Sequence, residues 1–156
     1  GLEKALLDKG FHVRLLDGDV TRRGLCSDLG FSVSDREENI RRVAEISKLF
    51  VESGIITINA FITPTERLRK LAIDIIGSDN LVSVYVNAPV EVCEARDVKG
   101  MYRKARRGDI PDFTGVSAPF EIPLNPDYKI DTTSRTPQQN IAELLEFIIP
   151  KIKFEA

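Results

Sequence analysis

The chain has 156 residues, which fits one domain with a full hydrophobic core, and 42% of its residues are hydrophobic. Its 22 basic and 24 acidic side chains give a net charge of −2, so no overall basic field favours nucleic acid. No apolar run approaches the roughly 20 residues that span a bilayer, and the first residues lack a signal-peptide pattern. We therefore expect a cytoplasmic protein that binds neither nucleic acid nor a membrane, in which Cys26 and Cys93 are free thiols.

Short strand patterns alternate with helical patterns along the chain. In order, they predict a helix at 2–9, a strand at 12–16, a helix at 34–52, a strand at 55–61, a helix at 65–76, a strand at 81–86, a helix from Pro89, a strand at 128–131 and a helix at 137–153. Glycines at positions 10 and 54 mark the ends of the first two helices. This alternation predicts an α/β fold, with three layers and helices on both faces of a parallel sheet.

The helix at 34–52 carries the clearest local signals. Ser34 and Glu37 have the spacing of a capping box, which predicts that the helix begins there. The face expected to be buried consists of Ile40, Val43, Ala44, Ser47 and Phe50.

Residues 98–126 interrupt the alternation, because they are basic at first and then rich in Gly and Pro. A structureless stretch of this length inside a compact domain is typically functional, often as a lid. Its basic residues, with one just before it, are Arg96, Lys99, Arg103, Lys104, Arg106 and Arg107. Only Tyr102 interleaves with them, so they favour a lid that grips phosphates over a nucleic-acid surface.

The segment Asp17-Gly18-Asp19 places two carboxylates directly after a predicted buried strand. Ligands of open parallel α/β sheets bind beyond the carboxyl ends of the strands. Two carboxylates there can hold Mg²⁺ or orient a hydroxyl for attack on phosphorus. Asp-Gly is also a common turn dipeptide, so a purely structural turn is the alternative.

Several further strings occur together with this one. They are Arg22 to Leu25, Asp28-Leu29-Gly30-Phe31-Ser32, Asp35-Arg36, Glu38-Asn39-Ile40-Arg41-Arg42, Phe61-Ile62-Thr63-Pro64, Glu91-Val92-Cys93-Glu94, Arg96-Asp97, Val98-Lys99-Gly100-Met101-Tyr102, Phe113-Thr114-Gly115-Val116 and Ala118-Pro119-Phe120-Glu121-Ile122-Pro123. In this order, from residue 5 to about 150, the chain closely resembles the adenylylsulfate kinases (APS kinases), a family of P-loop nucleoside-kinase-like enzymes. The resemblance implies transfer of the ATP γ-phosphoryl group to the 3′-hydroxyl of adenosine 5′-phosphosulfate in sulfate assimilation.

The resemblance also implies roles for individual residues. Those implied to bind the adenylyl sulfate are Arg22, Phe31, Arg36, Asn39, Ile62, Thr63, Lys99 and Phe113. Arg96 matches a position on the ATP side, and Asp17 and Asp19 match the acidic pair near Mg²⁺ and the attacking hydroxyl. We expect Asp19 to orient or deprotonate that hydroxyl, with Asp17 supporting it or the metal. Stacking of a purine on an aromatic ring contributes roughly 1–3 kcal/mol, which suits the two phenylalanines.

Three departures from the family pattern stand out. Thr63 occupies a position that is often Ser, and Val20-Thr21 replaces a more usual Asn-hydrophobic pair. The motif G-x-x-x-x-G-K-[ST], which cradles nucleotide phosphates, occurs nowhere in the 156 residues. We therefore expect a single domain, 1–156, that is N-terminally incomplete and lacks the first strand and phosphate loop, with very low ATP turnover by this exact polypeptide.

Two alternatives to the kinase remain open from the sequence. One is a non-catalytic nucleotide-binding module that lacks the phosphate loop and regulates a fused ATP sulfurylase. The other is a different small P-loop kinase acting on a nucleoside or a shikimate-like substrate, against which the strings at 28–31 and 99–100 argue. The resemblance also suggests a homodimer.

Overall fold

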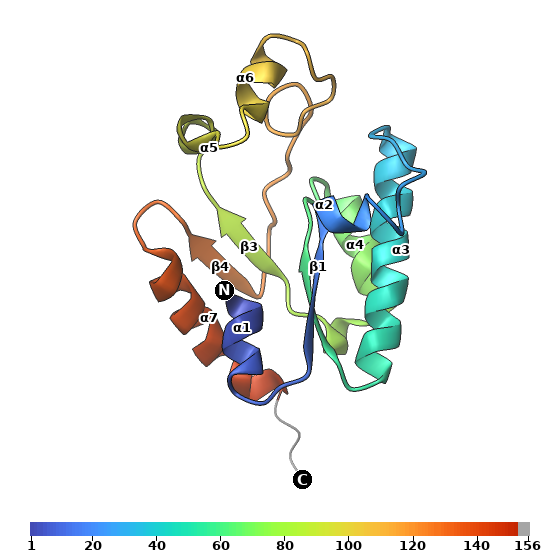
Figure 1. Cartoon of the computed structure of the whole chain (residues 1–156), viewed down its shortest axis with the longest axis vertical. Helices are drawn as coiled ribbons and strands as arrows, with labels where there is room; N and C mark the ends of the chain where they lie inside the picture. Colours follow the sequence, from blue (N-terminus) through green and yellow to red (C-terminus); the bar gives the residue numbers. More distant parts are fainter. Residues whose placement is uncertain (153–156) are drawn as a thin grey trace.

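The structure is a computed structural model that describes residues 1–152 (Figure 1). Its elements are α1 (Leu2–Leu7), β1 (Val13–Asp17), α2 (Gly18–Thr21), α3 (Val33–Glu52), β2 (Ile56–Ala60), α4 (Glu66–Ile76), the 3₁₀ turn η1 (Ser78–Asn80), β3 (Val84–Asn87), α5 (Val90–Arg96), α6 (Met101–Arg106), β4 (Tyr128–Asp131) and α7 (Pro137–Ile152). All nine helices and strands predicted from the sequence are present, within a few residues of their expected bounds. The predicted end of the last helix, Lys153, lies outside the described residues.

The strands pair in parallel, which confirms the predicted α/β fold. β1 pairs with β2 from Val13 opposite Ile56 to Asp17 opposite Ala60, and β3 pairs with β4. Within residues 1–152 the two pairs form separate two-stranded sheets, because no backbone ladder joins β2 to β3. The parallel strands expected from the sequence are therefore present as two separate pairs and not as one continuous sheet.

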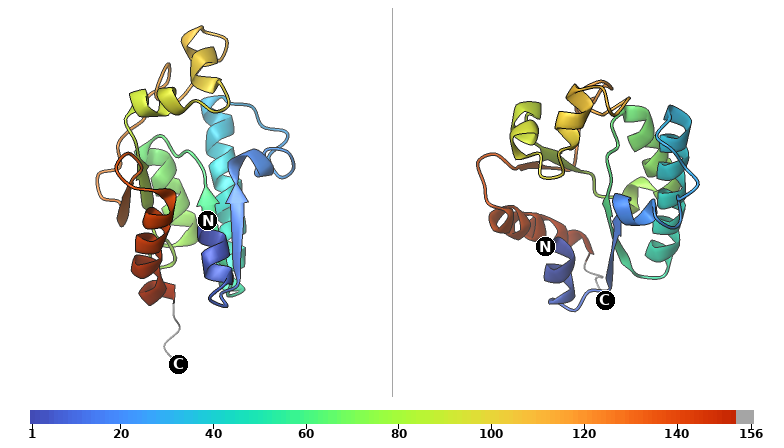
Figure 2. Two further views of the ribbon diagram at one scale, coloured as in Figure 1. Left: turned by 60° about the vertical axis from the view of Figure 1, so that its left-hand side comes forward. Right: turned by 45° about the horizontal axis from the view of Figure 1, so that its top comes forward.

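Helices cover the strands from two sides, as Figures 1 and 2 show. α1 and α7 lie together beside the β3–β4 pair, whereas α3 and α4 lie together on the far side of β1 and β2. The core beside α7 contains the buried side chains of Ile130, Leu144 and Ile148. On α3 the buried residues Ile40 and Val43 belong to the stripe that the sequence predicts. Because each helix buries only one face, the layers hold the strand ends in fixed positions.

The predicted N-cap residue of α3 is wrong. Ser32, not Ser34, is the N-cap residue, and its hydroxyl accepts a hydrogen bond from the Asp35 N–H at 3.1 Å. The Ser32 hydroxyl also donates to the Asp35 carboxylate at 2.8 Å, so a Ser-x-x-Asp pair does what we assigned to Ser34 and Glu37. The predicted stripe is buried except for Phe50, which is half-buried.

The expectation that residues 98–126 have no regular structure is also wrong. They contain α6, whose start is capped by the Asp97 carboxylate, which accepts from the N–H groups of Tyr102 and Arg103 at 3.0 Å each. A second compact turn follows, in which the carbonyl of Phe113 accepts from three N–H groups between Val116 and Ala118. The lid segment, 98–126, therefore has internal order. None of the helices described within 1–152 is long and apolar enough to cross a membrane.

Candidate functional site

The carboxyl ends of the strands face the lid segment, which rises above them at the top of Figure 1. β1 ends at Asp17, and β2 is followed by Phe61, Ile62 and Thr63. The first lid residues come directly after α5, and the last lead into β4. The fold thus collects most of the residues expected to bind substrate at one edge of the strands, where ligands of parallel α/β sheets bind.

Asp17 has a structural role that the sequence left open. It is the N-cap of α2, and its Oδ1 accepts from the N–H groups of Asp19 at 2.9 Å and Val20 at 3.2 Å. Both bonds use the same carboxylate oxygen, and neither uses Oδ2. The turn and the site interpretations are therefore compatible, because the turn fixes the direction in which Asp17 and Asp19 lie.

Asp19 meets the lid segment. Lys99 Nζ donates to Asp19 Oδ2 at 2.6 Å, although the two residues are 80 positions apart. The hydrogen bond and the charge of Lys99 lower the pKa of Asp19, and the same contact raises the pKa of Lys99. The side chain of Asp19 is 65% exposed and that of Lys99 is 72% exposed. Solvent therefore screens the pair, and the pair contributes little to stability.

The pair predicts a pH effect. Because the pKa of Asp19 is lowered, the pair persists above that value and is lost as the pH falls through it. Because the pKa of Lys99 is raised, the pair is lost at high pH only above the ordinary 10.5. Lys99→Gln should move the pKa of Asp19 up toward its ordinary 3.8, as a carboxyl ¹³C NMR titration would record. An unchanged titration curve would show that the contact does not exist in solution.

Arg22 holds the loop that precedes α3. Its Nη1 donates to the carbonyls of Gly30 at 2.8 Å and Leu29 at 3.3 Å, and its Cζ lies 4.3 Å from the ring centroid of Phe31. Phe31 is 63% exposed, which is unusual for so large an apolar side chain without a ligand or partner. The Arg22 guanidinium therefore supports one face of an exposed aromatic ring.

Arg36 connects α3 to the lid segment. Nε donates to the Phe31 carbonyl at 2.9 Å, Nη2 to the Asp112 carbonyl at 2.8 Å, and Nη1 to the Thr114 hydroxyl at 3.4 Å. Asp112 has φ 52°, a left-handed conformation that is uncommon for a residue other than glycine. Phe113 lies between the two lid residues that Arg36 contacts, one through its backbone carbonyl and the other through its hydroxyl.

The two phenylalanines have different surroundings. Phe113 is half-buried, and its ring meets Tyr102 edge-on at 5.0 Å between centroids. Phe31 is exposed beside Arg22, and the Cζ of Arg36 lies 5.8 Å from its ring centroid. Arg36 thus links the Phe31 backbone to the two neighbours of Phe113, an arrangement that could hold a planar group.

Asn39 follows Arg36 by one helical turn and is 4% exposed. Its Oδ1 is buried and has no hydrogen-bond partner among the described residues. Buried polar atoms are nearly always paired, since a lost hydrogen bond costs about 1–3 kcal/mol. Asn39 therefore presents a buried acceptor that no donor among residues 1–152 satisfies.

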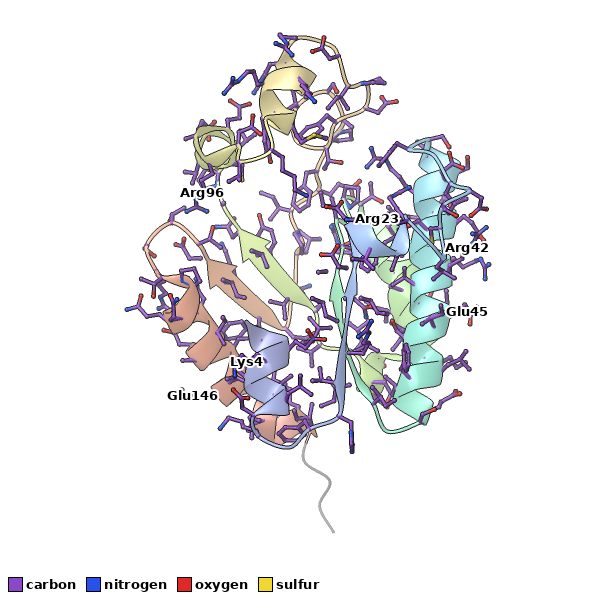
Figure 3. The ribbon with its side chains drawn as sticks, in the orientation of Figure 1. Lys4, Arg23, Arg42, Glu45, Arg96 and Glu146 are labelled. Carbon is purple, nitrogen blue, oxygen red and sulfur yellow. The ribbon has the colours of Figure 1, made fainter. Side chains whose placement is uncertain are left out.

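Arg42 has a structural role. It donates to both carboxylate oxygens of Asp28, at 2.6 and 2.8 Å, and to the Leu25 carbonyl at 3.0 Å. Hydrogen bonds from Arg41 and Arg42 lower the pKa of Glu38 to about 2. These ion pairs attach the loop between α2 and α3 to the side of α3, where Figure 3 shows Arg42 pointing outward.

The remaining predicted residues are more dispersed. Ile62 is 66% exposed, and the backbone carbonyl of Thr63 accepts from Arg69 Nη1 at 2.8 Å. Arg96 lies at the other side of the molecule, at the end of α5, and donates to the Thr132 hydroxyl at 3.1 Å (Figure 3). It borders a pocket of about 580 Å³, lined by Arg96, Ile130, Thr132, Arg135, Pro137, Asn140 and Ile141. Arg96 is thus separate from the aromatic pair.

Sequence reasoning missed two contributors to this edge. Asp112 gave no signal beyond its place before Phe113, and Arg69 resembled any basic residue on a helix surface. No cluster of three or more His, Cys, Asp or Glu side chains that could hold a metal occurs in the part of the chain that the structure describes.

Comparison with known proteins identifies the family. The sequence profile of adenylylsulphate kinase matches residues 1–131. This chain belongs to the adenylylsulfate kinase family. The adenylyl-sulfate kinase of Bacteroides thetaiotaomicron is 52% identical over 152 residues, which cover 97% of this chain and 76% of that protein. The enzyme of the same name from Shewanella pealeana is 48% identical over 147 residues, or 94% of this chain and 72% of that protein.

Solved structures agree with this assignment. The Mycobacterium tuberculosis APS kinase, solved in complex with AMPPNP and APS, superposes with a TM-score of 0.90 and 36% identity over 95% of this chain and 86% of that one. A hexameric APS kinase from Thiobacillus denitrificans gives a TM-score of 0.70 at 25% identity, covering 96% of this chain and 25% of that one. The predicted kinase family and P-loop-type fold are confirmed, and a different small P-loop kinase or a non-catalytic module is not favoured.

Proposed function

We propose that the edge formed by α2, α3 and the lid segment binds adenosine 5′-phosphosulfate, which the enzyme phosphorylates on its 3′-hydroxyl with ATP. Family membership supports the reaction. The observation that carries the placement is the buried, unpartnered Oδ1 of Asn39, one turn along α3 from Arg36. An adenine amino group or a ribose hydroxyl would supply the missing donor. Phe31 and Phe113 would hold the purine, and the guanidinium of Arg22 would face an anionic group.

The chemistry we assign to this edge is positioning and charge neutralisation, since phosphoryl transfer needs little covalent work from the protein. Asp19 would orient the attacking hydroxyl and accept its proton. For that it must exchange its contact with Lys99 for the substrate, and Lys99 would then be available to an anionic group. Thr63 and Ile62 would line the side of the substrate nearest the end of β2.

The donor set at this edge fits Mg²⁺ bound together with nucleotide phosphates. Mg²⁺ usually keeps several waters and takes one or two carboxylates in addition to phosphate oxygens. Asp17 and Asp19 supply two such carboxylates on one turn, and Oδ2 of Asp17 accepts none of the turn's hydrogen bonds. Bound Mg²⁺ would neutralise phosphate charge during transfer. We propose no residue of this chain for the ATP phosphates, and Arg96 only for the ATP side.

Asn39→Ala tests the placement. The expected result is a dissociation constant for adenylyl sulfate raised by about tenfold or more, with ATP affinity unchanged, measured by isothermal titration calorimetry. Lys48→Ala, on the exposed face of the same helix, is the matched control and should change neither. Equal weakening of both ligands would show that Asn39 supports the fold and not the substrate.

Other features are proposed from the sequence pattern or from the resemblance. These are a homodimer, an association with ATP sulfurylase, a cytoplasmic location, and the extent of the domain, 1–156 with the lid at 98–126. Light scattering of the purified enzyme would measure the mass of the assembly directly.

A further inference from the structure

Arg69 on α4 connects the residues that follow β2 to residue 121 of the lid segment. Its side chain is 14% exposed, and all three of its guanidinium nitrogens donate. Nη1 donates to the Thr63 carbonyl at 2.8 Å, Nη2 to the Glu121 carbonyl at 3.0 Å, and Nε to the Glu66 carboxylate at 3.0 Å. A planar guanidinium can satisfy three acceptors in fixed directions, which a lysine cannot do.

Glu121 strengthens the same junction from the lid side. Its N–H donates to the Pro64 carbonyl at 2.8 Å, and its carboxylate accepts from the Glu66 N–H, at the first turn of α4, at 2.6 Å. Acidic groups are favoured at that end of a helix. Glu121 therefore holds the lid segment against residues 63–66 through its backbone as well as through its side chain.

The junction lies close to Phe113 along the chain. Residues 113–118 form a tight turn, in which the Phe113 carbonyl accepts from three N–H groups and Gly115 N–H donates to the Ala118 carbonyl. Only Pro119 and Phe120 separate this turn from Glu121, and the Phe120 ring stacks on Tyr85 at 6.2 Å. Fixing Glu121 thus limits where Phe113 can go. Arg36 fixes the other side of the same residue.

We propose that Arg69 is a positioning residue for the binding of adenylyl sulfate. It clamps residue 121 of the lid segment to the Thr63 backbone and so places Phe113 over the substrate. The inference rests on the proposed substrate site. It adds a residue that touches no substrate and acts through the carbonyls of Thr63 and Glu121. Loss of the clamp affects the affinity for adenylyl sulfate, because the lid must then be ordered on binding.

Steady-state kinetics of Arg69→Ala, measured in a form of the enzyme that carries the phosphate loop, test the proposal. The expected result is a KM for adenylyl sulfate raised by about tenfold, with kcat and the KM for ATP changed less than about threefold. Arg69→Lys keeps the charge but not the forked geometry, and should give an intermediate KM. In hydrogen exchange of the free enzyme, the Glu121 amide should exchange about tenfold faster in Arg69→Ala than in the unmodified protein.

Arg67→Ala is the matched control, because Arg67 lies on the same helix, is 71% exposed and pairs only with Glu37 among the described residues. It should leave all three kinetic constants unchanged. If Arg69→Ala does not fold, Arg69→Lys carries the test. The proposal would be overturned if the Arg69 variant left the KM for adenylyl sulfate unchanged. It would also be overturned if kcat and both KM values changed equally. Asn39→Ala measured alongside separates the hypotheses, since an effect there without one at Arg69 refutes only the clamp. No effect at either refutes the site.

Discussion

Replacing Asp19 by alanine, in a form of the enzyme that carries the phosphate loop, is expected to lower kcat by about a thousandfold while the enzyme still binds adenylyl sulfate. A positioned general base typically contributes 10²- to 10⁴-fold, and Asp19 is the exposed carboxylate of the pair at the end of β1. Asp17 caps α2 through Oδ1, and we expect it to support Asp19 or Mg²⁺. Coupled-assay turnover and calorimetric binding, measured on the same preparation, separate the loss of chemistry from the loss of binding.

Two variants sharpen the Asp19 result. Asp19→Asn keeps the size and one acceptor oxygen but cannot take a proton, so it should lose nearly as much turnover as the alanine variant. Asp74→Ala removes an exposed carboxylate on α4 that pairs only with Lys70 among residues 1–152, and should retain full activity. Turnover near that of the unmodified enzyme in Asp19→Asn would remove the base role from this residue.

Arg36→Ala is expected to raise the dissociation constant for adenylyl sulfate by about a hundredfold and to leave ATP affinity within about threefold. The variant removes hydrogen bonds to the Phe31 and Asp112 carbonyls together. Phe31 loses a guanidinium neighbour, and Phe113 loses the contact that ties its backbone to α3. Lost preorganisation then adds to the lost contacts, because the lid has to be ordered at the moment of binding.

The control for Arg36 is Arg41→Ala on the same helix. Arg41 pairs with Glu38 and Glu45 on the outer face of α3 and contacts no lid residue. Its removal should change neither ligand's affinity. Comparable losses of ATP and adenylyl sulfate affinity in Arg36→Ala would contradict its placement at the adenylyl sulfate site.

Local sequence determined the elements and the type of chemistry. The alternation of short β-branched runs with 3.6-residue periodicity predicted every strand and five of the helices, since burial on one or two faces leaves a periodic pattern. Asp17 and Asp19 were predicted as site residues because they follow a strand, and ligands of parallel sheets bind beyond the carboxyl ends of the strands. The resemblance then supplied the family, which the comparisons confirmed. Where local signals competed, as at Ser32 and Ser34, the prediction took the wrong cap.

Tertiary structure decided which of these residues meet. The contacts of Lys99 with Asp19, of Arg36 with Asp112 and of Arg69 with Glu121 join residues 80, 76 and 52 positions apart. Two of them end on backbone carbonyls, which every residue has, so no residue type in the sequence marks them as partners. The left-handed turn at Asp112 and the unpaired Oδ1 of Asn39 likewise depend on what packs around them. A periodic pattern records which face is buried, whereas a long-range hydrogen bond depends on the folded path of the chain.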